Sequence, residues 1–249
     1  MASYRLFYWP QIPGRGEFVR LAFAAAKVPL PEVNDVGKLV ALTSADGGVA
    51  GHEPQFAVPV LEVQPERQAP FYLSQTGNIL QFVAKRFGLD GEQPGVESDV
   101  THAQVLQFTL TGLDWALEAH NVHHPISVAL YYEDQKPEAL RYTQAFVHER
   151  IPKFAKHFQA ALTLNRQRHN VRRLVGTKTS VADLVLFQVL EGLRFAHPRA
   201  MQRLQDSGDA ADLEPFRAEL AEELKEYLGS ARRRPFSDGL FRYYSELDL

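Results

Sequence analysis

The first ninety residues alternate between short apolar runs and longer segments that carry apolar side chains on one face. Periodicity of this kind separates strands from helices. The short runs predict three strands, at residues 4–9, 58–63 and 68–73. The one-faced segments predict two helices, at residues 17–27 and 75–87, and Gly88 follows the second as a C-cap. The pattern therefore predicts a small α/β unit.

The pattern changes after residue 89, and every later periodic segment is helical. Residues 90–96 are rich in glycine, proline and acidic side chains, which is typical of a linker. Ser180 and Asp183 have the spacing of a capping box and precede a long apolar run. We expect an α/β domain at residues 1–89 and an all-helical domain at residues 97–249. The predicted helices include residues 97–122, residues 137 to about 164, and residues 213–228.

Composition narrows the class of protein. The 249 residues are 45% hydrophobic and 23% charged, with a formal net charge of -3, so we expect neither nucleic acid nor a membrane as partner. No apolar run approaches the roughly 20 residues of a membrane span, which makes a cytoplasmic location the expectation. The sequence contains no cysteine, which excludes disulfides, thiolate metal sites and a cysteine nucleophile.

Two features near the N-terminus suggest a site. Tyr8 ends the first predicted strand, where its phenol can donate a hydrogen bond to a bound thiolate; the alternative is a half-buried strand aromatic. Tyr4 falls at the start of that strand, far from any cleft mouth. Arg15 stands between Gly14 and Gly16 at the start of a helix. Glycines allow close backbone approach, so Arg15 can hold a carboxylate, or merely lie solvated beside a tight turn.

Two dipeptides later in the α/β unit add to the site. Val58-Pro59 heads a strand after a long loop, so it is a candidate cis bond that presents its backbone to an extended peptide. The alternative is an ordinary edge-strand proline. Gln75-Thr76 opens a helix and offers an amide and a hydroxyl to a carboxylate and its ammonium group. The alternative there is simple capping, with Ser74 as the cap.

These features, in this order and spacing, resemble the cytosolic glutathione S-transferases of the tyrosine type, similar to the sigma, pi and mu classes and to a bacterial or protist branch. The resemblance covers nearly the whole chain. It is carried by YWPQIPGRGEFVRLAF, QFAVPVLEV, SQTGNILQFVAKRFGL and SVADLVLFQVLEGL. It implies a thioredoxin-like α/β domain followed by an all-α helical-bundle domain.

The resemblance also implies an activity and a set of roles. The chain would be a transferase of the detoxification type that conjugates the glutathione thiolate to a soft hydrophobic electrophile. Tyr8 would be the catalytic residue and stabilise the thiolate. The remaining glutathione contacts would come from Arg15 near the tripeptide, from Val58 and Pro59 on the cysteinyl backbone, and from Gln75 and Thr76 on the γ-glutamyl end.

The same resemblance implies a homodimer in which Asp114 reaches the glutathione of the neighbouring subunit; the alternative is a solvated helix residue. Glutathione is a co-substrate, so no metal or organic cofactor is expected. Two alternatives remain open: a glutathione-dependent isomerase, and a non-catalytic protein of the same fold that binds hydrophobic ligands. Product analysis separates transfer from isomerisation.

A histidine cluster needs its own interpretation. His120 and His124 stand four residues apart, with His123 between them, which suggests metal spacing. Pro125 disfavours helical geometry at His124, and no carboxylate has a compelling spacing. We therefore expect no metal here. These histidines would instead end a helix favourably against its dipole, or line the electrophile pocket.

Overall fold

The computed structural model describes residues 2–44, 48–91, 93 and 95–249. One four-stranded sheet lies at one end of the molecule, with the strand order β2-β1-β3-β4. β1 pairs parallel with β2, and β3 runs antiparallel to both β1 and β4. The strands are β1 (Ser3–Phe7), β2 (Glu32–Val33), β3 (Val60–Gln64) and β4 (Phe71–Ser74). The two-residue β2 is too short to leave a periodic signal in the sequence.

Helices make up most of the remaining described chain. The α/β part contains α1 (Gly16–Ala25), α2 (Val36–Thr43) and α3 (Thr76–Phe87). The later part contains α4 (Ser98–Asn121), η1 (Tyr132–Asp134), α5 (Lys136–Ala145), η2 (Phe146–Arg150), α6 (Ile151–His169), α7 (Val181–Ala196), α8 (Pro198–Ser207), α9 (Leu213–Glu223), α10 (Lys225–Leu228) and η3 (Ser245–Leu247). This order confirms a thioredoxin-like unit followed by an all-helical one.

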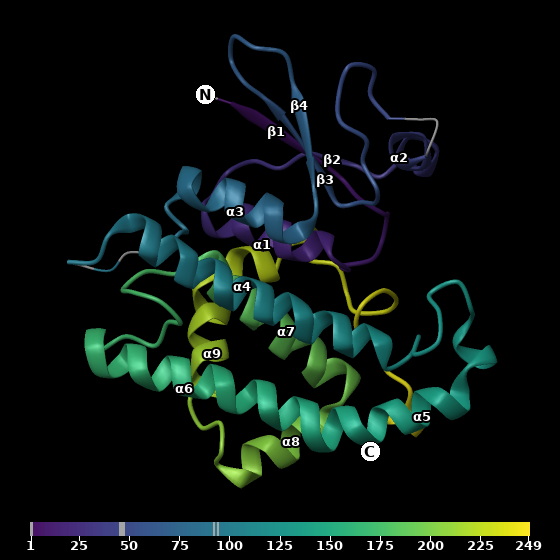
Figure 1. Cartoon of the computed structure of the whole chain (residues 1–249), viewed down its shortest axis with the longest axis vertical. Helices are drawn as coiled ribbons and strands as arrows, with labels where there is room; N and C mark the ends of the chain where they lie inside the picture. Colours follow the sequence, from purple (N-terminus) through teal and green to yellow (C-terminus); the bar gives the residue numbers. More distant parts are fainter. Residues whose placement is uncertain (1, 45–47, 92, 94) are drawn as a thin grey trace.

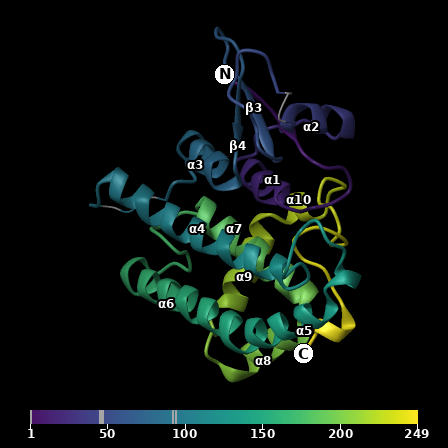
Figure 2. The same cartoon turned by 45° about the vertical axis from the view of Figure 1, so that its right-hand side comes forward.

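The molecule is layered below the sheet. Figures 1 and 2 show α1 and α3 beneath the strands, then α4 and α7, with α6 and α8 at the far end. α7 lies at the centre and is buried along almost its whole length. A hydrogen bond of 2.8 Å from the Val181 amide to the Leu89 carbonyl ties its start to the α/β part. Among helices of the described residues, none has both the length and the apolar character needed to cross a membrane.

The predicted capping box is present at the start of α7. The Asp183 carboxylate accepts hydrogen bonds from the Ser180 amide and hydroxyl, at 2.8 and 2.7 Å, and from the Leu174 amide at 2.8 Å. Burial raises the pKa of this carboxyl, and the three donors oppose the shift. The box therefore satisfies backbone groups that a buried helix start would otherwise leave unpaired.

Two predicted helices are wrong in their extent. The helix expected from residue 137 to about 164 is α5, one π-helical turn and α6, which continues to His169. Pro152 at the start of α6 has no amide hydrogen, so the regular hydrogen-bond ladder cannot pass through it. The helix expected at 213–228 is interrupted at Leu224. The predicted linker, 90–96, includes residues 92 and 94, which lie outside the described residues, and the domain boundaries stay a prediction.

Candidate functional site

Three of the predicted site positions stand side by side at one edge of the sheet. Phe7 pairs with Val60 in β3, and Val60 pairs with Ser74 in β4. The next residue of each strand outward from this row is Tyr8, Pro59 or Gln75. Since neighbouring strands lie about 4.8 Å apart, the row from Tyr8 through Pro59 to Gln75 spans roughly 10 Å. Sheet pairing alone thus assembles a continuous edge from segments distant in sequence.

The loop that follows β1 wraps its backbone around the Tyr8 ring. A Cβ added at Gly14 would lie 2.1 Å from the phenol oxygen, and one at Gly16 would lie 2.6 Å from Cδ1 of the ring. Gly14 also has a φ of +44°, which disfavours a side chain. The Arg15 amide donates a hydrogen bond of 2.6 Å to the phenol oxygen. The two glycines therefore seat the tyrosine.

The surroundings of Tyr8 determine the protonation and hydrogen bonding of its phenol. Tyr8 is only 4% exposed, so it is more deeply buried than the half-buried aromatic of the alternative interpretation. Burial raises the pKa of Tyr8, although the amides of Arg15 and Gly16 and the charge of Arg20 oppose the shift. The side chain remains a phenol at neutral pH. Because its oxygen already accepts from Arg15, its own proton is free to be donated. Tyr4, in contrast, packs edge-on against Phe23 and Phe87 in the core.

The Val58-Pro59 peptide bond is cis, as the sequence suggested. The alternative of an edge-strand proline is wrong, because β3 lies between β1 and β4. Among the described residues, no turn or loop hydrogen bond uses the amide or the carbonyl of Val58. Both groups are therefore available to an extended peptide laid beside this segment.

Gln75 and Thr76 form an unusual helix start. Gln75 has a φ of +67°, a region that side-chain-bearing residues rarely adopt. The capping alternative is wrong, because no side chain of the described residues caps α3, and its N-cap is Gln75 rather than Ser74. The Thr76 hydroxyl is buried without a hydrogen-bond partner in the part of the chain described. An unpaired buried hydroxyl and a strained backbone at a helix N-terminus are typical of a binding site.

Comparisons with known proteins identify the fold. Residues 120–231 match the family described as Glutathione S-transferase, C-terminal domain. The sigma-class glutathione S-transferase of Fasciola hepatica superposes with a TM-score of 0.67 at 18% identity, covering 95% of this chain and 98% of that one. The pi-class enzyme of Onchocerca volvulus superposes with a TM-score of 0.66 at 20% identity, with the same coverage. No curated protein matches the sequence.

Residues 120–231 therefore match a glutathione S-transferase C-terminal domain, and the chain as a whole has the fold of the glutathione S-transferases. The charge of Arg15 acts both on Tyr8 at the sheet edge and on His120 at the end of α4. Arg15 is half-buried, and its charge adds to the burial that lowers the pKa of His120. The Arg15 amide donates a hydrogen bond to the Tyr8 phenol, so this one residue interacts both with the phenol and with the end of α4.

Asp114 lies on the exposed face of α4 in this transferase fold, between Leu110 and Leu117, which are 48% and 43% exposed. These three positions repeat at helical spacing and share one face. Asp114 is not part of the row formed by Tyr8, Pro59 and Gln75. Its predicted contact with a neighbouring subunit stays a prediction.

The transferase fold also contains a buried ionic network that the sequence did not reveal. Arg20 is 2% exposed and binds Glu17 at 3.0 Å and Glu32 at 2.9 Å. Arg233 reaches Glu17 and Arg234 reaches Glu32, each at 2.7 Å. The network fastens the C-terminal tail to the loop that holds Tyr8. The three consecutive arginines at 232–234 were visible in the sequence. Their sequence context does not indicate that they bind carboxylates some 200 residues earlier.

The histidines at the end of α4 are neutral in this transferase fold. Burial lowers the pKa of His120 to about 4 and that of His123 to about 3, with the neighbouring histidines and Arg242 acting in the same direction. The expectation that they end the helix by charge against its dipole is therefore wrong. α4 does stop at Asn121, so His124 lies outside it as Pro125 predicted.

The close packing of the Tyr8 ring against Gly16 can be tested by mutation. We expect Gly16→Ala to lower the free energy of unfolding by about 1–3 kcal/mol, because the added methyl must displace the tyrosine ring. Gly37→Ala is the matched control, since Gly37 also lies in the first turn of a helix and its Cβ would meet only the Asp35 side chain, at 3.3 Å. Urea unfolding measures both. Equal stabilities for the two variants would contradict the close packing described here.

Proposed function

We propose that the chain is a glutathione transferase that uses the Tyr8 hydroxyl to stabilise the glutathione thiolate for attack on a soft hydrophobic electrophile. The observation that carries the proposal is the state of the phenol. Its oxygen accepts from the Arg15 amide at 2.6 Å, which leaves its proton for the sulfur and polarises the O–H bond.

The sheet edge supports glutathione as the thiol. An extended tripeptide spans roughly 10 Å, which equals the row from Tyr8 to Gln75. We place the cysteinyl backbone against Val58 and Pro59, with its sulfur toward Tyr8. The γ-glutamyl end then meets Gln75 and the unpaired hydroxyl of Thr76, and Arg15 remains a contact near the tripeptide.

A hydrogen bond from Tyr8 supplies most of the energy that thiolate stabilisation needs, and the proposed mechanism uses no metal or organic cofactor. A free thiol has a pKa of about 8.5, and lowering it by about two units needs roughly 2.7 kcal/mol. One charge-assisted hydrogen bond contributes about 1.5–3 kcal/mol, most of that amount. The other contacts orient the thiolate toward the electrophile. The electrophile pocket would be built by the helical part and the tail, and the setting would be cytoplasmic detoxification.

A second candidate reaction uses the same thiolate. Prostaglandin synthase D of Nilaparvata lugens superposes with a TM-score of 0.65 at 16% identity over 94% of this chain and 99% of that one. A glutathione-dependent isomerase would therefore fit the same fold, and product analysis distinguishes it. A non-catalytic binding protein of this fold would gain nothing from the seat of Tyr8, so the phenol favours catalysis.

We also propose that the chain forms a two-fold dimer through the exposed face of α4. Leu110 and Leu117 are exposed there, and Phe56 in the loop before β3 is 87% exposed. Exposed apolar side chains of this size are typical of an interface. Asp114, between the two leucines, would then reach the partner subunit, where a carboxylate can accept from the ammonium group of glutathione.

The thiolate itself gives the first test. In an ultraviolet difference titration, we expect the pKa of bound glutathione to lie about two units below the free value. Tyr8→Phe should lose about one to two units of that shift and keep most of the affinity, because only the hydroxyl is removed. Tyr4→Phe, in the strand β1 that ends just before Tyr8, should leave the shift intact. A bound thiol whose pKa is unshifted in the wild type would refute the proposed mechanism.

Thr76 provides a second test with opposite effects on stability and binding. Thr76→Val replaces an unpaired buried hydroxyl with a methyl group, so the free energy of unfolding should stay the same or rise by up to about 1 kcal/mol. Glutathione affinity should fall about 5- to 30-fold. Thr109→Val is the control: its buried hydroxyl bonds the Val105 carbonyl, so it should lose stability and keep affinity. Calorimetry and urea unfolding measure the two quantities, and unchanged affinity in Thr76→Val would remove Thr76 from the site.

Sedimentation velocity tests the dimer. The wild type should sediment as two chains, and both Phe56→Asp and Leu117→Asp should shift it to one, because each places a charge in the proposed interface. Leu164→Asp changes an equally exposed leucine on α6 and should leave the dimer intact. A monomeric wild type, or dissociation by Leu164→Asp as well, would be the contrary result.

A further inference from the structure

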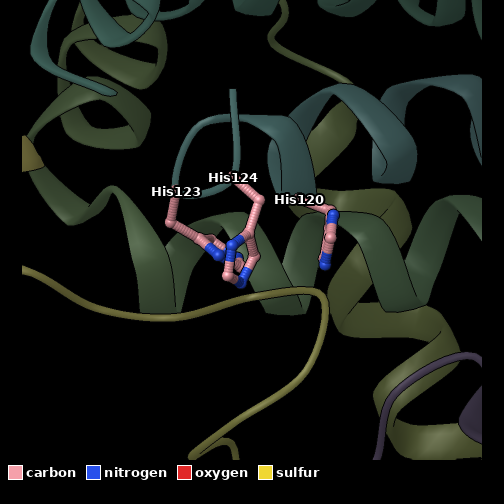
Figure 3. Close-up of side chains that lie close together, drawn as sticks. All are labelled: His120, His123 and His124. Atoms are coloured by element: carbon pink, nitrogen blue, oxygen red, sulfur yellow. The ribbon is translucent and has the colours of Figure 1, made fainter. Parts of the chain in front are cut away.

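Three histidine rings come together where α4 ends. His120 belongs to the last turn of the helix, and His123 and His124 follow in the turn that leaves it. Figure 3 shows the three side chains extending in the same direction from the end of α4, with the rings of His123 and His124 overlapping in the view and the His120 ring beside them. Their ring centroids are 4.7–5.1 Å apart, and one nitrogen from each ring lies within 4.8 Å of the others. The turn therefore returns His124 to the helix end, which the sequence pattern did not anticipate.

The spacing suits a small cation. Zinc binds imidazole nitrogen at 2.0–2.1 Å, so two nitrogens of a tetrahedral shell lie roughly 3.4 Å apart. Small rotations of the half-buried His120 and His124 toward the buried His123 would bring nitrogens from at most 4.8 Å to that separation. Three histidines leave one position of a tetrahedral shell open to another ligand.

The surroundings of the His123 ring resemble the support that metal-binding histidines receive. Nε2 of His123 lies 3.3 Å from the Leu240 carbonyl, so it carries the proton and donates it. Nδ1 is then a lone-pair nitrogen, buried and without a partner among the described residues, on a side chain that is 1% exposed. The contact of His123 with Leu240 is of the kind that sets tautomer and orientation at metal sites. The Gln135 amide donates to Nδ1 of His124 at 3.2 Å, which leaves the proton on Nε2, so this ring must release Gln135 when it binds a metal.

We propose that His120, His123 and His124 bind one divalent transition-metal ion of the zinc class. The site lies within reach of the charge of Arg15, a proposed glutathione contact, but it needs neither glutathione nor the transferase reaction. Arg15 and Arg242 lie close enough to act on these rings, and the Tyr244 ring packs 6.3 Å from His123. The two positive charges oppose a cation and favour an anionic fourth ligand at the open position.

The test is a metal titration of the full chain without a polyhistidine tag and without glutathione. Calorimetry with Zn²⁺ should give one ion per chain, and Co²⁺ should produce the visible spectrum of a tetrahedral site. His120→Ala and His124→Ala should each weaken binding at least ten-fold. His169→Ala, at the end of α6, is the control and should bind as the wild type does. Zn²⁺ should also raise the melting temperature of the wild type and of His169→Ala but not of the cluster variants.

A charge variant separates a cation site from an anion site built on the same basic groups. Arg242→Gln should tighten Zn²⁺ binding several-fold, because it removes a repelling charge. Failure to bind one ion per chain would overturn the proposal. Equal losses in His169→Ala, or weaker Zn²⁺ binding in Arg242→Gln, would overturn it as well. None of these results depends on whether the chain conjugates glutathione.

Discussion

The fit between the Tyr8 ring and the backbone of residues 14–16 is the contact on which the rest of the site depends. It requires two glycines, because a methyl group at either position would enter the space of the ring. It also provides the amide that occupies one lone pair of the phenol. A tyrosine with a satisfied oxygen and a free proton is a hydrogen-bond donor of fixed direction. The two glycines of PGRGEF are thus needed to make room for the Tyr8 ring, and not only to form a turn.

The C-terminal tail closes the space around this contact from the other side. The backbone at Gly239 approaches Gly14, with a Cβ position only 3.5 Å from its Cα. Phe241 fits against Gly192 of α7, where any side chain would overlap the ring. Arg234 donates to the Trp9 carbonyl at 2.8 Å and to Glu32, which binds the buried Arg20. The tail therefore contacts the loop that holds Tyr8, the edge of the sheet and the central helix, although these are far apart in sequence.

The parts that the sequence predicted are those encoded locally. Tyr8, Pro59 and Gln75 each end or begin a strand or helix, and strand pairing then aligns them without further information. The capping box at Ser180 is likewise a four-residue signal. The sequence failed where the outcome depends on distant packing. Arg233 meets Glu17 across 216 residues, and no periodicity encodes such a pair. His124 was set aside because of Pro125, yet a turn brings its ring back to the helix.

A crystal structure of the chain with glutathione tests the central claim most directly, through the distance between the Tyr8 phenol oxygen and the bound sulfur. The account predicts the extended tripeptide along the row from Tyr8 to Gln75, with the sulfur within hydrogen-bond distance of the phenol and the Arg15 amide still bonded to the phenol oxygen. A tripeptide bound elsewhere, or a sulfur facing another donor while Tyr8 remains closed against its loop, would contradict it.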